Sequence, residues 1–132
     1  MGVFTSRGRE NRFERESKLE ATFNITQGLN FDLSIARAFN KQFAEDFNLI
    51  PCKINVEHFR GSNLIGQHRR GDKLIRINER LNDTQRWETF FHEIAHYRMR
   101  GHSKAFHEEM EMVYRRFVLW FDTMTNPIKK YA

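Results

Sequence analysis

The sequence predicts a single small domain of the α+β class, in which a three-stranded sheet packs with an N-terminal helix, a central helix and a C-terminal helix. Two observations carry this prediction. Segments with strand patterning are gathered between residues 52 and 78, and helical apolar stripes lie before and after them. The chain has 132 residues, which is enough for one compact core and too few for two.

Residues 1–25 are predicted to form a charged, flexible arm ahead of a domain that spans residues 26–125. Between Arg7 and Glu20, acidic and basic residues alternate and leave only Phe13 and Leu19 as apolar anchors. Such a composition is typical of a mobile arm or a weak helix, because it buries little apolar surface. Residues 126–132 are interpreted as a C-terminal tail.

The first long helix is predicted from about residue 31 to 48. Asn30 or Asp32 can cap its N-terminus, and Pro51 ends the region. Apolar side chains recur at every fourth position, which places them on one face of a helix. These residues are Phe31, Ile35, Phe39, Phe43 and Phe47.

Three strands are predicted next. Residues 52–58 alternate around Ile54 and Val56, and residues 64–68 and 73–78 flank the turn Arg70-Gly71-Asp72 as a hairpin. The hairpin strand that precedes the central helix is expected to be an exposed edge of the sheet.

The central helix is predicted to begin at a cap formed by Asp83 or Thr84 and to run to about Arg100, with Gly101 placed to end it. Its apolar stripe consists of Trp87, Phe90, Phe91, Ile94 and Ala95. Ser103 can cap the last helix, and Asn126-Pro127 breaks it. The stripe of that last helix consists of Phe106, Met110, Val113, Phe117 and Trp120.

A metal site is predicted on the polar side of the central helix. His92 and His96 are four residues apart, so they share one helix face and can direct two imidazoles at one ion. Glu93 lies beside them, where the general base for a metal-activated water is expected. His102 follows the helix and is predicted to be the third ligand. Three protein ligands and an open position are the pattern of a catalytic zinc site.

Other residues compete for places in this site. His107 is an alternative third ligand, although it lies beyond the junction at which His102 can turn back towards the first two histidines. A structural zinc needs a fourth protein ligand, which His107 or Cys52 could supply. Neither Tyr97 nor Tyr114 is placed by the sequence to stabilise an oxyanion.

The run from His92 to Phe106 resembles the core of the SprT-like and WLM-type minimal zinc metallopeptidases, which are short, gluzincin-like HExxH zincin domains. Their pattern has a third histidine after a variable spacer and a phenylalanine four residues later, matched here by His102 and Phe106. Gly66-Gln67-His68, Leu74–Asn78 and Leu81 are similar to the glycine-started hairpin of that family. Metzincins share this spacing of the three histidines, but the chain departs from their pattern, because Met99 stands where that family requires glycine and no Met-turn is evident.

These observations predict a zinc-dependent peptidase with one Zn²⁺ held by His92, His96 and His102. Glu93 takes the proton of the attacking water and passes it to the leaving amine. The resemblance implies that the exposed edge of the sheet binds an extended peptide as a further strand. It also implies an action on proteins associated with DNA. The alternative is a nucleic-acid-associated or protein-binding module whose zinc is structural and not catalytic.

The charge balance bears on partners. The chain has a net charge of +5, and Lys and Arg residues cluster between residues 60 and 86. That basic stretch is equally compatible with a solvated sheet rim and with non-specific contact to DNA. The single cysteine, Cys52, cannot form an intramolecular disulfide, and with no apolar run of membrane-spanning length or signal peptide the protein is expected to be cytoplasmic.

Overall fold

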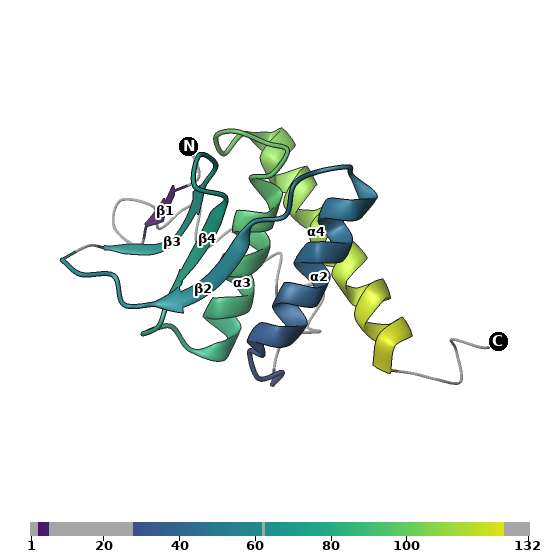
Figure 1. The fold of residues 1–132 in the computed structure, drawn as a ribbon, viewed down its shortest axis with the longest axis horizontal. Helices are drawn as coiled ribbons and strands as arrows, with labels where there is room; N and C mark the ends of the chain where they lie inside the picture. The colour runs from purple at the N-terminus through teal and green to yellow at the C-terminus, as the bar shows by residue number, and fades with distance from the viewer. Residues whose placement is uncertain (1–2, 6–27, 62, 126–132) are drawn as a thin grey trace.

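A computed structural model describes residues 3–5, 28–61 and 63–125 of the chain. Its elements in order are β1 (Val3–Thr5), α2 (Leu33–Asp46), β2 (Lys53–Glu57), β3 (Leu64–Arg69), β4 (Leu74–Asn78), α3 (Asp83–Ala95) and α4 (Lys104–Thr125). Figure 1 shows α2, α3 and α4 gathered on the same side of the sheet. The predicted α+β class is therefore confirmed. No helix within the described part of the chain is long and apolar enough to cross a membrane.

The sheet has four strands in the order β1-β3-β4-β2. The hairpin of β3 and β4 is antiparallel as predicted, while β2 pairs with β4 in parallel. Two expectations change. β4 is an interior strand, so the prediction that it forms an exposed edge is wrong. Val3–Thr5 adds a fourth strand to the predicted three. The rest of the predicted arm (residues 1–2 and 6–25), the first two residues of the predicted domain (26–27) and the tail after residue 125 lie outside the described residues.

The helix boundaries follow local hydrogen bonding. Asp32 caps α2, because its side chain accepts from the backbone N–H groups of Ser34 and Ile35. The cap of α3 is Asn82, one residue before the predicted pair, and it forms a capping box with Gln85. Asp83 instead accepts from the backbone N–H of Phe31 at 3.0 Å, which joins the segment before α2 to the start of α3.

The core is built mainly from aromatic side chains. Phe117 of α4 is central, with ring centroids 5.1 Å from Trp87, 5.1 Å from Phe91 and 5.3 Å from Phe39. All four residues are at most 2% exposed. Truncation of such a ring to alanine typically destabilises a domain by about 3–5 kcal/mol. The packing of the predicted apolar residues of α2 and α4 against those of α3 therefore fixes the position of α3.

Strand register places two residues of β3 beneath α3. Gly66 pairs with Ile77 and His68 pairs with Ile75, and both isoleucines are fully buried. Because partners in register point to the same face of a sheet, Gly66 and His68 face the central helix and its polar side.

Candidate metal centre

Three histidines converge at the end of the central helix. The Nε2 atoms of His92, His96 and His102 lie 3.1–3.2 Å from one another. His92 and His96 are fully buried, whereas His102 is partly exposed. The structure thus brings together the three residues that the sequence predicts as metal ligands, and they form a group that could hold a metal ion.

The triangle fits a zinc ion in its dimensions and in its donor chemistry. Tetrahedral zinc with bonds of about 2.0–2.1 Å to imidazole places two ligating nitrogens about 3.3 Å apart. His96 Nδ1 lies 2.9 Å from the carbonyl oxygen of Met99, which can only accept, so Nδ1 carries the proton and Nε2 presents a lone pair. Burial lowers the pKa of His96 to about 2, which keeps this imidazole neutral. A cation held here would be bound by the Nε2 lone pair of His96 together with those of His92 and His102.

The helix ends earlier than predicted, and this early end positions His102. α3 stops at Ala95, and His96 is its C-cap. The chain then turns, with the backbone N–H of Met99 donating to Ala95 O, and Gly101 adopts a φ of 70°. Glycine reaches this left-handed region without steric penalty. The role of Gly101 is therefore to redirect the chain after the turn, so that His102 faces the other two histidines.

Phe106 forms one wall of the histidine triangle. Its ring centroid lies 4.8 Å from that of His92, 4.6 Å from His96 and 5.0 Å from His102. Phe106 is fully buried at the start of α4. A phenylalanine four residues after the third histidine thus has a physical reason: it fixes the orientation of all three imidazoles by packing against them.

Glu93 is fully buried beside the triangle, and its carboxylate faces β3. A Cβ atom placed on Gly66 would lie 3.0 Å from Glu93 Oε2 and 2.3 Å from Thr89 Cγ2. The second distance is shorter than side-chain contacts allow, so only glycine lets β3 approach α3 this closely. The glycine that begins the hairpin pattern is therefore a spacing element between the sheet and the predicted base.

Gly66→Ala is expected to push β3 away from α3 and to destabilise the fold by about 1–3 kcal/mol, the usual range for an overpacked core. Thermal unfolding measures this change. Gly71→Ala is the matched control, because a Cβ there meets nothing within 4 Å. Thr89→Ser removes the clashing Cγ2 and is expected to restore part of the loss in the double variant. Equal stability of the Gly66 and Gly71 variants would contradict the close approach.

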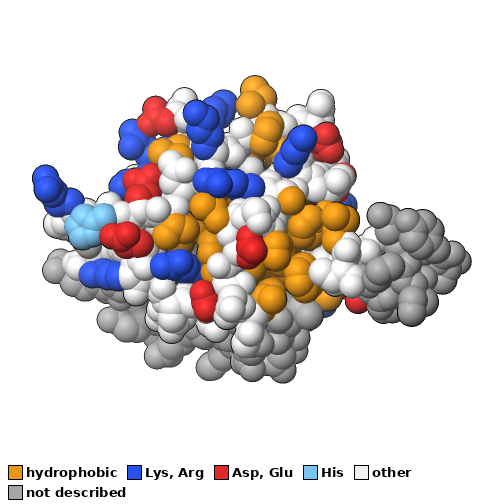
Figure 2. Space-filling view, turned by 60° about the horizontal axis from the view of Figure 1, so that its bottom comes forward, with side chains coloured by type: hydrophobic (Ala, Val, Ile, Leu, Met, Phe, Trp, Pro, Cys, Tyr) orange, Lys and Arg blue, Asp and Glu red, His pale blue; other side chains and the backbone are white. Residues whose placement is uncertain are grey.

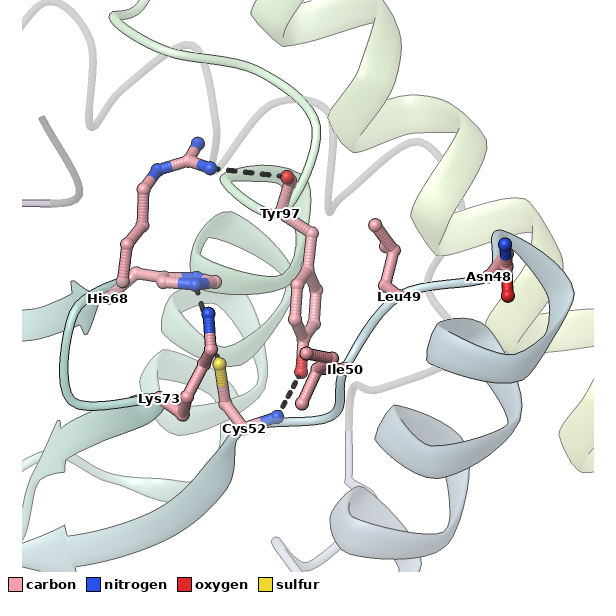
Figure 3. A pocket seen from close by; sticks show the side chains of 8 residues that line it. Asn48, Leu49, Ile50, Cys52, His68, Lys73 and Tyr97 are labelled. Carbon is pink, nitrogen blue, oxygen red and sulfur yellow. Dashed lines mark hydrogen bonds between the residues drawn. The ribbon is translucent and has the colours of Figure 1, made fainter.

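A second group of side chains supports the helix from the sheet side (Figure 3). His68 Nδ1 lies 2.7 Å from the carbonyl oxygen of Glu93, so its N–H donates there and leaves Nε2 as an acceptor. Cys52 Sγ lies 3.6 Å from that Nε2, and the thiol donates to it. Burial raises the pKa of the Cys52 thiol and lowers the pKa of His68, so both are neutral. The backbone of the predicted base is thus anchored to β3.

Tyr97 and Arg70 complete this support. The Tyr97 hydroxyl donates to Asn40 Oδ1 at 2.6 Å and accepts from the backbone N–H of Cys52 at 2.7 Å. The Arg70 guanidinium donates to the carbonyl oxygens of His96 and Tyr97. Its positive charge is also stabilised there by the negative end of the α3 helix dipole. A pocket of about 250 Å³ opens over this group. None of these roles was predicted, because their partners are 12 or more residues apart in sequence.

The alternative ligands lie elsewhere. Among the described residues, the histidine triangle has no fourth His, Cys, Asp or Glu member, so neither Cys52 nor His107 belongs to it. The Cys52 thiol is directed at His68, and the ring of His107 packs beside Phe106 at 5.6 Å. The Tyr97 hydroxyl is engaged with Asn40 of α2 and with Cys52 just before β2, and Tyr114 packs on Phe91 in the core. Neither tyrosine is placed as an oxyanion donor by these contacts.

Comparison with known families adds one finding. The family model Peptidase_M78, described as the IrrE N-terminal-like domain, matches residues 45–116. This range is more than half of the chain and contains β2, β3, β4, α3 and the histidine triangle. No curated protein and no solved structure matches the chain.

Proposed function

This chain belongs to the Peptidase_M78 family of IrrE N-terminal-like domains, and from that premise we propose that it is a zinc-dependent peptidase. The observation that carries the proposal is the triangle of Nε2 atoms beside a buried glutamate. The family is metallopeptidase-like, as the motif predicts. The narrower resemblance to SprT-like and WLM-type peptidases remains part of this proposal.

His92, His96 and His102 would hold the zinc ion, and each offers one imidazole nitrogen. When bound, zinc supplies Lewis-acid chemistry, which polarises the substrate carbonyl and makes water a better nucleophile. Three ligands leave the open position that such chemistry requires. His96 is held in the ligating tautomer by Met99 O, and Phe106 keeps the rings in place.

Glu93 is the proposed general base and acid. Its carboxylate accepts the proton of the attacking water and then donates it to the nitrogen of the leaving amine, so that the C–N bond breaks without releasing an amide anion. The hydrogen bond from His68 to Glu93 O holds the helix backbone at this residue, and Gly66 leaves room for the carboxylate. His68 acts through Glu93 and is a positioning residue.

The substrate is proposed to bind as an extended peptide along the outer edge of β3. β4 is interior, so it cannot accept a further strand. The far edge of the sheet, at β2, is covered by α2, since Arg37 donates to Ile54 O at 3.0 Å and Asn40 donates to Cys52 O at 2.9 Å. A peptide on the β3 edge passes Gly66 and therefore runs beside Glu93.

Metal removal tests the proposed function. Treatment with a chelator is expected to abolish cleavage of an unfolded protein substrate such as casein, and one equivalent of zinc should restore it. Thermal stability should follow the same course, because a ligand that binds only the folded state stabilises it, by about 2.7 kcal/mol at a hundredfold excess over Kd. Cleavage that persists in metal-free protein would exclude this mechanism.

We also propose a weak contact between the 60–86 basic stretch and DNA, in line with the action of SprT-like peptidases on DNA-bound proteins. Several of these basic side chains already have intramolecular partners: Arg69 pairs with Asp72, Arg76 with Glu57, and Arg70 with His96 O. On the face drawn in Figure 2, Lys and Arg side chains are dispersed, with Asp and Glu among them. These features favour a low affinity.

The salt dependence of DNA binding tests this contact. Glutamine substitutions of the exposed residues Arg60, Lys73 and Arg80 are expected to flatten the slope of log affinity against log salt by about one unit per lost phosphate contact. The control replaces exposed basic residues outside the stretch, Lys41, Arg100 and Lys104. Arg70 is left unchanged because its guanidinium donates to the carbonyl oxygens of His96 and Tyr97 at the end of α3. Equal slopes for the two variants, or no binding of labelled DNA at low salt, would refute the contact.

A further inference from the structure

The proposed peptide-binding edge of the sheet is already occupied by a segment of this chain. β1 pairs with β3 in the antiparallel direction, with Val3 opposite Gln67 and Phe4 opposite Gly66. Because β4 takes the other side of β3, β1 covers the one edge of β3 at which another strand could add. Figure 1 shows β1 beside β3 at this end of the sheet.

The pairing position matters for the metal centre. Gly66 is the residue whose Cβ would meet the carboxylate of Glu93 at 3.0 Å, and it is also the partner of Phe4. Adjacent strands lie about 4.8 Å apart in a sheet. The backbone of β1 therefore runs one strand spacing from the β3 residue that contacts the proposed base, which is the path assigned above to a substrate peptide.

The pairing of β1 is limited in extent and irregular. It involves Val3–Thr5, and its register shifts between Phe4 and Thr5. The pairing of β2 with β4, by comparison, runs in register over residues 53–57. A short strand with a register irregularity loses few ladder hydrogen bonds when it separates, so the fold can release β1 while the rest of the sheet stays paired.

We propose that Val3–Thr5 is an intramolecular competitor, which must leave the β3 edge before an extended peptide can reach Glu93. This inference rests on the proposed function for the meaning of the edge, although the competition itself involves backbone pairing alone. The apparent affinity of a peptide is reduced by the fraction of molecules whose edge is open. A chain that cannot form β1 should therefore bind extended peptides more tightly.

The test uses the full chain with two variants of β1 in a Glu93→Gln background, so that no probe is cleaved. Neighbouring N–H groups of a strand point to opposite edges, so Val3→Pro with Phe4→Pro removes whichever group faces β3. Val3→Ile with Phe4→Ile is the matched control, because it alters the same positions and retains strand propensity. The probe is a fluorescent peptide with the sequence of residues 1–8, followed by anisotropy.

The proline variant is expected to bind the peptide at least about threefold more tightly than the isoleucine variant and the parent. Amide hydrogen exchange within residues 64–67, the part of β3 that pairs with β1, should be faster in the proline variant and slow again once peptide is added. Equal peptide affinity in all three proteins, or exchange in β3 that the prolines do not change, would overturn the proposal. Both readouts are independent of catalysis. A chain that cleaves no peptide would therefore refute the proposed function, while peptide affinity and hydrogen exchange would still decide whether β1 competes for the β3 edge.

Discussion

Glu93→Gln is expected to keep zinc content near one ion per chain while peptide cleavage falls by at least about 10²-fold, the usual contribution of a positioned general base. Glutamine matches glutamate in size and polarity but cannot accept the proton of the attacking water. The side chain is fully buried against Gly66, so an isosteric change avoids the cavity that alanine would leave. Zinc analysis and initial rates on the same preparation separate binding from chemistry.

Glu109→Gln is a matched control for this substitution. Glu109 is also a buried glutamate, 7% exposed, but it lies on α4 and pairs with Arg98 at 3.5 Å. Burial raises the pKa of Glu109, while the charge of Arg98 lowers it. Because Glu109 lies outside the histidine triangle, Glu109→Gln is expected to leave peptide cleavage and zinc content unchanged. A similar loss of activity in both variants would mean that burial of a carboxylate, and not its place beside the triangle, accounts for the effect. Unchanged cleavage by Glu93→Gln would refute the assigned base.

Alanine at His92, His96 or His102 is expected to weaken zinc binding by more than about 100-fold, since even outer-shell partners of a ligand contribute 10–100-fold. Each variant would leave two imidazoles in place of three, and a lost nitrogen ligand would be replaced only by the weaker ligand water, since each Nε2 lies within 3.2 Å of both others. His107→Ala should leave most binding intact, because His107 is outside the triangle. Isothermal titration with zinc measures each affinity.

Folding must be separated from binding in this series. His92 and His96 are fully buried, so their alanine variants also leave cavities. Thermal unfolding with and without zinc makes the distinction: a variant that has lost the site should show no zinc-dependent stabilisation, whatever its metal-free stability. Loss of zinc in His107→Ala, with retention in His102→Ala, would reverse the assignment of the third ligand.

The convergence of His92, His96 and His102 could be predicted from the sequence because the patterns that place them are local. His92 and His96 share a helix face by helical period alone, and the glycine and phenylalanine near His102 mark the turn that returns it. The stripes of α2, α3 and α4 and the β3–β4 hairpin are local patterns of the same kind. Each was predicted to within a few residues, and the main error was the C-terminus of α3, which His96 caps.

The sheet order could not be predicted because alternation reports only which face of a strand is buried. Ile75 and Ile77 show that β4 faces the core, but they do not show that β2 pairs on one side of it and β3 on the other. β1 is too short to carry a periodic signal. The contacts of His68, Cys52 and Arg70 with α3 and the residues after it depend on that sheet order. They could therefore not be predicted from the sequence either.

X-ray absorption at the zinc edge tests the central claim most directly, because it reports which atoms surround the metal. If His92, His96 and His102 form a catalytic site, the spectrum of the purified wild-type protein should fit three imidazoles and one further light atom, all at about 2.0–2.1 Å. A sulfur scatterer at about 2.3 Å would indicate the single cysteine, Cys52, on the metal, and a fourth imidazole would indicate a further histidine such as His107. Either result would indicate a structural zinc and contradict the proposed peptidase.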